Sequence, residues 1–358
     1  MKNKIDEKER LFRRVFAGEE DYMPLIVSPQ LNCPEGITYP SSMEFKEDTA
    51  KSIASAVEML KPKVEINSDW IPMINISYYQ NILVPSLIGA EIAFQDGSDP
   101  MAKRSSAEIK DVFKNGIPPL EGKLVEEMIA TLRTAIRCMP DGFKLSFPVC
   151  SSPFDIAQLM FGEEFLVSSV LEPEMVNEFL MNLTELSIKA FDLVKKEMGQ
   201  NADEYITNRG LFFPGLRLPC DALVTFSPSL IKDIALPVLK RFGERYGNLC
   251  IHYCTSPSPS QHVLPVLLES DFVGAVDNWQ GPGVFIGDDA PARMQDKIAL
   301  ITDIDLITEE KIRNFIGSKP VREIPRKGGR GIVANTKSGS VDEGRRIYET
   351  WQKSTKLK

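Results

Sequence analysis

The regular alternation of short apolar runs with longer helical segments most constrains what this chain of 358 residues can fold into. The short runs are rich in β-branched residues, and the longer segments repeat apolar residues at helical spacing. Such alternation is typical of parallel strands joined by helices. Short strand-like runs are predicted near residues 23–27, 71–76, 90–94, 143–149, 204–207, 222–225, 249–253, 273–276, 298–302 and 331–334.

Ten short runs, of which about eight would be barrel strands, favour over this length a closed (β/α)8 barrel with insertions. A doubly wound open sheet is the alternative that the pattern leaves open. No change of composition marks a linker, so residues 1–358 are predicted to form a single domain. No GxGxxG follows the first strand, and the chain has no GxxxxGK[ST] motif. Neither a dinucleotide site nor a phosphate-binding loop is therefore predicted.

Composition narrows the classes of protein and partner. Hydrophobic residues make up 43% and charged residues 26% of the chain, as in ordinary globular domains. The net charge of −8 argues against a nucleic-acid surface. No apolar run approaches the roughly 20 residues of a membrane span. The charged N-terminal segment has no signal-peptide core, and the six cysteines form no CxxC pair, so a cytoplasmic protein with reduced thiols is expected.

The strand at residues 249–254 carries the most informative side chains. Alternation places Cys250, His252 and Cys254 on one face. The Ser/Pro-rich loop that follows marks the carboxyl end of this strand, where barrel enzymes place their sites. Side chains two residues apart are about 7 Å apart, so His252 and Cys254 can converge on one zinc ion, while a third ligand must come from elsewhere. The alternative is a buried strand with core thiols and one satisfied histidine.

Other polar residues follow predicted strands. Asn208 and Arg209 come after residues 204–207, and Arg209 would suit a carboxylate or phosphate. Tyr79, beside Tyr78, could line a pocket or pack in the core. A further polar and aromatic cluster, Asp277, Asn278 and Trp279, follows the strand at 273–276. For all of these residues that follow strands, the alternative is a solvated loop at the surface.

Several segments resemble the uroporphyrinogen decarboxylase superfamily, which includes methyltransferases that work with corrinoid proteins. Residues 226–242 with the following His-Tyr-Cys are similar to the helix and the HxCG strand of that superfamily. Three more segments match in the same order: 81–94, 151–162 and 301–308. The resemblance extends over about residues 10–352. It implies a (β/α)8 barrel, often a homodimer, with its cleft at the carboxyl ends of the strands.

The departures from the family pattern disfavour decarboxylation. A decarboxylase that handles a tetrapyrrole with eight carboxylates needs arginines in its pocket. Residues 28–36 contain none where the family has two. Asn81 stands at the position of the catalytic aspartate by its spacing to Gly89, and Asp221 is kept but is followed by alanine. The remaining departures are Gln158 and Leu159 in place of a tyrosine, and residues 333–339 in place of a Gly-His-Gly.

The resemblance favours a methyltransferase or demethylase that acts on a small methylated substrate with a corrinoid protein, whose cobalt(I) would attack the methyl group. His252 and Cys254 match the first two zinc ligands of that pattern, but no later cysteine follows. Asp277 or Asp305 could replace the third ligand. Uroporphyrinogen decarboxylation and a non-catalytic ligand-binding protein remain the alternatives. The residues assigned to the site are Asp277 and Arg209 as catalytic, and Asn81, Tyr79, Asn208, Asp221 and Trp279 as substrate-binding.

Overall fold

The structure is a computed structural model. It describes residues 2–29, 39–94, 99–146, 151–253, 261–278, 297–306, 308–318 and 331–355.

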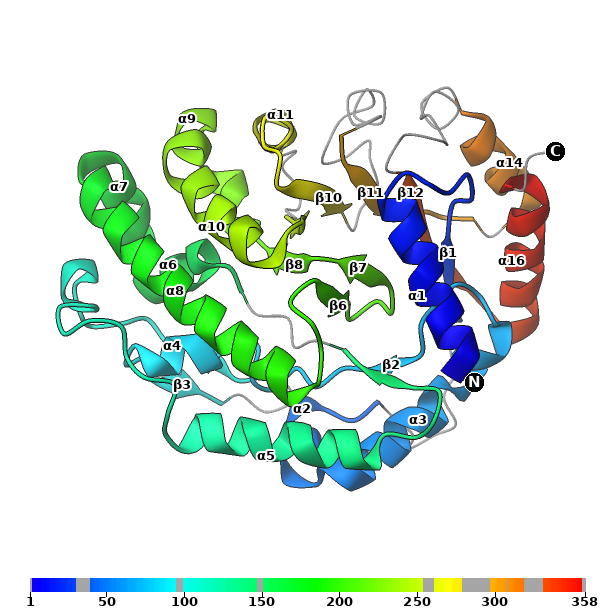
Figure 1. The fold of residues 1–358 in the computed structure, drawn as a ribbon, viewed down its shortest axis with the longest axis horizontal. Coiled ribbons are helices and arrows are strands. Elements are labelled where there is room, and N and C mark those ends of the chain that lie inside the picture. The colour runs from blue at the N-terminus through cyan, green and yellow to red at the C-terminus, as the bar shows by residue number, and fades with distance from the viewer. Residues whose placement is uncertain are drawn as a thin grey trace.

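A six-stranded sheet forms the centre of the described molecule (Figure 1). All of its neighbouring strands are parallel, so their carboxyl ends lie at one edge. Alternating strands and helices were predicted, and the sheet confirms that α/β class. In spatial order the strands are β1 (Leu25–Pro29), β12 (Ile332–Ser338), β11 (Ala299–Asp303), β10 (Val273–Asn278), β9 (Leu249–His252) and β8 (Leu216–Pro219).

A second, two-stranded parallel sheet pairs β2 (Met73–Ile74) with β5 (Lys144–Leu145). Single backbone hydrogen bonds link this pair to both edges of the large sheet. The Asp69 N–H, just before β2, donates to the Leu25 carbonyl of β1 over 3.2 Å. The Ser152 N–H, after β5, donates to the Pro219 carbonyl of β8 over 3.1 Å. This arrangement is consistent with a fold like that of the (β/α)8 barrels.

Helices surround the strands (Figure 1). Local signals explain where they begin and end. The Ser152 side chain caps α6 by accepting from the Asp155 N–H, Pro173 begins α8, and Gly162 ends α6 with φ of 59°. The helices are α1 (Lys2–Phe16), α2 (Ser42–Glu47), α3 (Thr49–Ile66), α4 (Leu83–Leu87), α5 (Lys123–Cys138), α6 (Pro153–Phe161), α7 (Glu163–Leu171), α8 (Pro173–Glu197), α9 (Pro228–Leu230), α10 (Leu236–Tyr246), α11 (Val263–Leu267), α14 (Glu309–Gly317) and α16 (Val341–Thr355).

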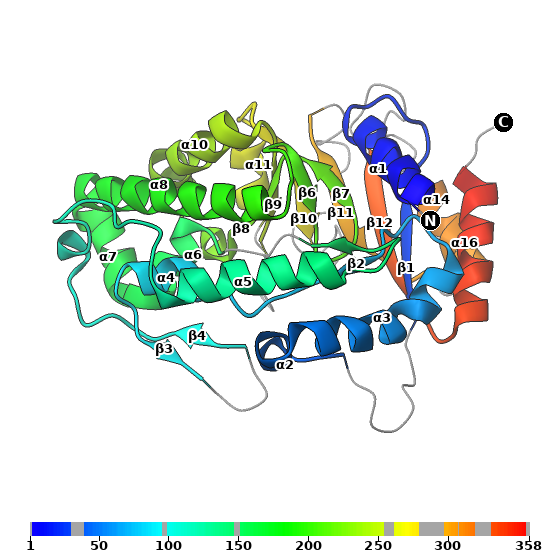
Figure 2. The same ribbon diagram turned by 60° about the horizontal axis from the view of Figure 1, so that its bottom comes forward.

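Two hairpins lie outside the parallel sheets. Strands β3 (Ile92–Ala93) and β4 (Met101–Ala102) pair antiparallel, as do β6 (Glu204–Ile206) and β7 (Phe212–Pro214). Figures 1 and 2 place the β6–β7 hairpin beside the strands of the central sheet. The runs at 90–94 and 204–207 are therefore extended, as predicted, but each belongs to a hairpin.

One predicted strand was wrong. Residues 222–225 lie in a 3-10 helix, Asp221–Thr225, and the strand of the sheet is β8, earlier in the chain. The sequence concealed β8 because Arg217 interrupts its apolar residues. Only a tertiary ion pair makes that arginine compatible with burial. Across the described ranges, none of the helices combines the length and apolarity needed to cross a membrane.

Candidate functional site

A buried ion pair lies at the carboxyl edge of the sheet. Arg217 Nε of β8 donates to Asp277 Oδ2 of β10 over 2.6 Å, and the two residues are 3% and 1% exposed. Burial by itself would raise the pKa of Asp277, but the charges of Arg217 and Arg209, together with the hydrogen bond from Arg217, hold that pKa below its usual value. Asp277 is therefore a fixed carboxylate. Its Oδ1 atom is buried and has no hydrogen-bond partner among the residues described.

His252 lies between these two strands, at the end of β9. The register pairs His252 with Pro219 on one side and with Asp277 on the other. Its Nδ1 lies 2.8 Å from the backbone carbonyl of Asp277. A carbonyl can only accept, so Nδ1 carries the proton and Nε2 carries the lone pair. Nε2 lies 3.9 Å from Asp221 Oδ1.

The imidazole of His252 is neutral at pH 7. Burial lowers its pKa to about 4, and the charge of Arg217 adds to that effect. A neutral imidazole whose Nδ1–H is bound to a carbonyl is the state in which histidine ligates a metal through Nε2. Cys250, two residues earlier, is fully buried, and burial raises the pKa of its thiol well above the usual value. Cys250 is therefore an inert core thiol.

The predicted metal pair can be placed only in part, because Cys254 lies outside the described residues, as does Trp279. Within the described part of the chain, no three histidine, cysteine or carboxylate side chains gather as a metal site would require. Of the suggested replacement ligands, Asp277 is bound to Arg217, and Asp305 pairs with Lys311. Among the described carboxylates, Asp221 is the one that faces Nε2 of His252.

Arg209 reaches the same edge from the turn of the β6–β7 hairpin. Its two terminal nitrogens bind both oxygens of Asp303, at the end of β11; the Nη2–Oδ2 distance is 3.1 Å. The paired geometry fixes the guanidinium. Asn208, the residue before it, has a buried Oδ1 with no hydrogen-bond partner in the described structure. The two predicted residues therefore lie together, with Arg209 already neutralised.

A cavity of about 800 Å³ opens beside this pair, at the carboxyl ends of β1, β11 and β12. Its positive side chains are Lys63, Arg209 and Lys337. Its carboxylates are already engaged: Asp303 binds Arg209, Asp305 binds Lys311, and Glu343 accepts the Gly339 N–H. The full lining is Ile26, Ser28, Lys63, Asn208, Arg209, Asp303, Ile304, Asp305, Asn335, Thr336, Lys337, Ser338, Gly339 and Glu343.

A second cavity of about 480 Å³ brings Asn81 and Asp221 together, beside Asp155. Asn81 Oδ1 accepts the hydroxyl of Ser151 over 3.1 Å. Asp155 Oδ1 accepts the Ala222 N–H over 2.8 Å. Burial raises the pKa of Asp155 to about 7. Asp155 was not among the residues predicted for the site, although its place three residues after the capping Ser152 is plain in the sequence.

The side chain of Tyr79 packs in the protein core. It is 2% exposed, its hydroxyl lies 3.0 Å from the Thr131 hydroxyl of α5, and its ring meets Tyr78 edge to face. It lines neither of these two cavities. The structure thus gives no support to the predicted contact of Tyr79 with substrate. Two adjacent tyrosines look the same in a sequence whether they pack against a helix or line a pocket, so the sequence could not distinguish these two roles.

Known structures share this fold. No protein-family model matches the chain, and no curated protein matches it in sequence. A methyltransferase from Methanosarcina mazei superposes with a TM-score of 0.63, over 96% of this chain and 97% of that one. The chain shares the fold of that methyltransferase. The two sequences are 13% identical, so the likeness concerns the fold alone. A B12-independent methionine synthase from Shewanella sp. W3-18-1, solved with selenomethionine, is 10% identical over 93% of this chain and 97% of that one, with a TM-score of 0.47.

Proposed function

We propose that this chain is a methyltransferase-type enzyme built as a closed (β/α)8 barrel. The eight strands of the two parallel sheets and the backbone hydrogen bonds at both seams support the closed ring. One cluster of buried side chains, from Ile5 in α1 to Trp351 in α16, supports a single domain. The shared fold with a methyltransferase supports the reaction class. The resemblance of the His-Tyr-Cys strand to corrinoid-linked methyltransferases supports it from the sequence side.

The orientation of His252 is the observation that carries the proposal. Its proton is on the nitrogen that faces the Asp277 carbonyl, and its lone pair is on the nitrogen that faces Asp221. This is the arrangement of a histidine prepared to bind zinc, with its second ring nitrogen oriented by a carbonyl. We assign His252, Cys254 and Asp221 as the ligand set. Zinc held there would polarise the heteroatom that carries the methyl group and would stabilise the thiolate or alkoxide that is released when the methyl group is transferred.

The surrounding residues would hold the substrate and the site. The Arg217–Asp277 pair joins β8 to β10 behind the imidazole and so fixes the carbonyl that orients it. Asn208 and Arg209 border the 800 Å³ cavity, where the amide can hydrogen-bond a small methylated substrate. The corrinoid of a partner protein would accept the methyl group.

Decarboxylation of a polycarboxylate is less well supported. Both arginines described at this edge, Arg209 and Arg217, are bound to aspartates, so neither offers an uncompensated charge to a substrate carboxylate. A non-catalytic binding protein would use the same cavity. Measured turnover of a substrate would distinguish an enzyme from such a binding protein.

Metal analysis tests the assignment. We expect about one zinc per chain by plasma mass spectrometry in the wild type, and loss of zinc in His252→Ala and Cys254→Ala. His262→Ala is the matched control, because the other histidine of the chain contacts the Phe226 carbonyl and should leave zinc unchanged. A metal-free wild type purified without chelators would contradict the zinc assignment. Zinc without methyl transfer to a corrinoid, over a panel of methylated thiols, alcohols and amines, would favour the binding protein.

A further inference from the structure

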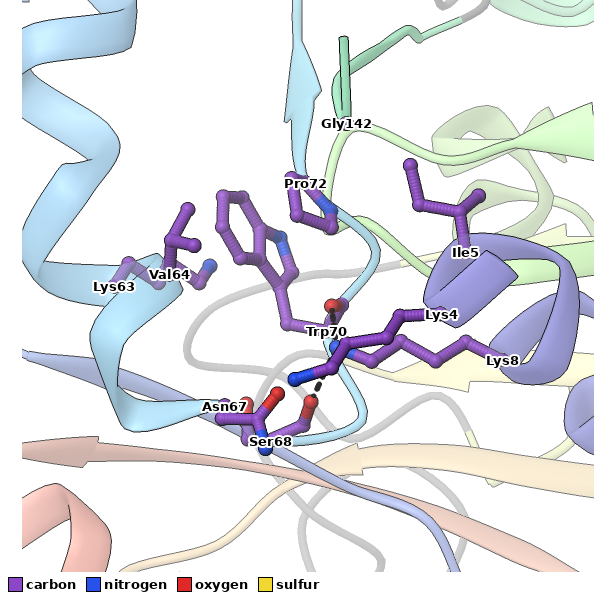
Figure 3. A pocket seen from close by; sticks show the side chains of 10 residues that line it. All are labelled: Lys4, Ile5, Lys8, Lys63, Val64, Asn67, Ser68, Trp70, Pro72 and Gly142. Atoms are coloured by element: carbon purple, nitrogen blue, oxygen red, sulfur yellow. Dashed lines mark hydrogen bonds between the residues drawn. The ribbon is translucent and has the colours of Figure 1, made fainter. Parts of the chain in front are cut away.

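We propose that the chain has a second binding site, for a small carboxylate with an apolar body, between α1 and the segment that leads into β2. A cavity of about 340 Å³ lies there, and Figure 3 shows its lining. Pro72 precedes β2 and Gly142 precedes β5, so the cavity lies at the amino ends of these strands. The site described above lies at the carboxyl ends, and Lys63 is the residue that the linings of the two cavities share. The proposal therefore does not depend on the proposed function.

The chemistry of the walls defines the ligand. Apolar surface comes from Ile5, Val64, Trp70 and Pro72. Three lysines and no carboxylate are among the residues that line the cavity. The volume of this cavity is near the lower limit of small-molecule sites, so the cavity is too small for a nucleotide or a tetrapyrrole. The lysines are Lys4, Lys8 and Lys63.

Lys8 is held in place at the cavity wall. Its ammonium donates to the Ser68 carbonyl over 2.7 Å and to the Trp70 carbonyl over 2.8 Å, as the dashed lines of Figure 3 show. An ammonium has three N–H donors, so two neutral carbonyls leave capacity for an anion. Burial lowers the pKa of Lys8 to about 8. A bound carboxylate would compensate that buried charge.

Asp69, which lies between the two residues whose carbonyls accept from Lys8, does not fill this role. Its carboxylate accepts the hydroxyls of Tyr22 and Tyr348 and the Leu25 N–H. These partners belong to the β1 and α16 side, and Asp69 does not line the cavity. Its charge reaches Lys8 only at a distance.

Lys63 adds positive charge from the other side of the indole. Figure 3 places its amine on the α3 side of Trp70, while Lys4 and Lys8 come from α1. The amine lies 4.3 Å from the ring centroid of Trp70. Burial, and then the charge of Arg209, lowers the pKa of Lys63 to about 7. Lysines from α1 and α3 thus lie on two sides of the Trp70 indole. This arrangement suits a flat ligand that carries a carboxylate.

Benzoate and its neutral isostere benzamide test the charge requirement. Binding is followed at pH 6, below the lowered pKa values of Lys8 and Lys63, by ligand-observed NMR on the full chain and by tryptophan emission. We expect benzoate to bind at least about tenfold more tightly than benzamide, with the difference reduced at high salt. Trp70→Phe should remove the change of emission on binding. Equal binding of the two compounds, or no binding of either at millimolar concentration, would overturn the proposal.

Lysine substitutions locate the site. Lys4 is exposed, so Lys4→Met should fold normally and weaken benzoate about three- to tenfold. Lys63→Met should weaken it similarly, and Lys61→Met, which loses an exposed ion pair to Glu58 on the same helix, should bind as the wild type does. His252→Ala should also bind normally, which separates this site from the zinc proposal. Unchanged affinity in both Lys4→Met and Lys63→Met would refute this location.

Discussion

Arg217 shows how one side chain can determine the structure around it. Its guanidinium is buried, and the carboxylate of Asp277 in β10 neutralises its positive charge. The backbone carbonyl of Asp277 also orients His252. A buried pair of this kind adds little net stability compared with an apolar pair. Removal of one partner, however, leaves an uncompensated charge. The pair therefore fixes geometry at the candidate site more than it stabilises the fold.

Asp277→Asn should destabilise the protein by about 3–5 kcal/mol, because Arg217 would remain buried without its counter-ion. Urea unfolding followed by circular dichroism measures the change. Glu65→Gln, which removes an exposed pair with Arg345, is the control and should cost about 0–1 kcal/mol. The double variant Arg217→Met with Asp277→Leu should recover much of the loss. Equal effects of Asp277→Asn and Glu65→Gln would contradict a buried charge pair.

At the scale of elements, the β6–β7 hairpin connects distant parts of the chain. Its turn places Arg209 against Asp303 of β11, and the Gly210 carbonyl accepts the Ile71 N–H over 2.7 Å. Gly210 has φ of 73°, a conformation that favours glycine. A Cβ atom there would lie 2.1 Å from Trp70 Nε1 and 2.5 Å from the Ile71 carbonyl oxygen. The hairpin can approach the start of β2 only because residue 210 has no side chain.

Gly210→Ala should therefore cost about 2–4 kcal/mol, from overpacking added to backbone strain. Gly199→Ala isolates the backbone contribution. Gly199 has a similar φ of 65°, and nothing lies within 4 Å of an added Cβ. That control should cost about 1 kcal/mol. Thermal and urea unfolding of the two variants give the comparison, and equal losses would mean that the hairpin can move away from Trp70.

At the scale of the whole molecule, buried lysines determine how stability changes with pH. Burial lowers the pKa of Lys63 to about 7 and those of Lys8 and Lys195 to about 8, from 10.5. Between pH 7 and 8.5 the unfolded chain keeps these protons while the folded chain loses them. Stability must then rise with pH over this range. Asp155 acts in the opposite direction, because its raised pKa of about 7 makes its contribution decline as pH rises through that value.

The free energy of unfolding should rise by about 1–3 kcal/mol from pH 7 to pH 8.5, because the three lysines outweigh the aspartates whose pKa burial raises, Asp69, Asp155 and Asp303. Urea unfolding at half-unit steps of pH measures this rise. Lys63→Met should give a flatter profile, because one of the three depressed lysines is removed, and Lys61→Met should follow the wild type. A constant or falling profile would show that the lysines keep their protons in the folded protein. The range stops at pH 8.5 because the raised pKa values of Cys220 and Cys250 reduce stability above it.

The sequence by itself determined the α/β class and most of the strands. The runs at 249–253 and 298–302 predicted β9 and β11. It also indicated polar residues at strand ends, of which Asn208 and Arg209 border one cavity. Asn81 and Asp221, which the family resemblance indicated, border another. These patterns are local, because burial of one face imposes a period on consecutive residues.

Only the tertiary structure decided which charges could be buried. Arg217 in β8 is compatible with the interior because Asp277, 60 positions away in the sequence, neutralises it, and Arg209 is fixed because Asp303 ends a neighbouring strand. Tyr79 faces α5 through a contact with Thr131 that its own sequence neighbours do not indicate. The protonation of His252 likewise depends on a carbonyl of β10. Compensation of a buried charge depends on distance in space, and a one-dimensional pattern does not contain that distance.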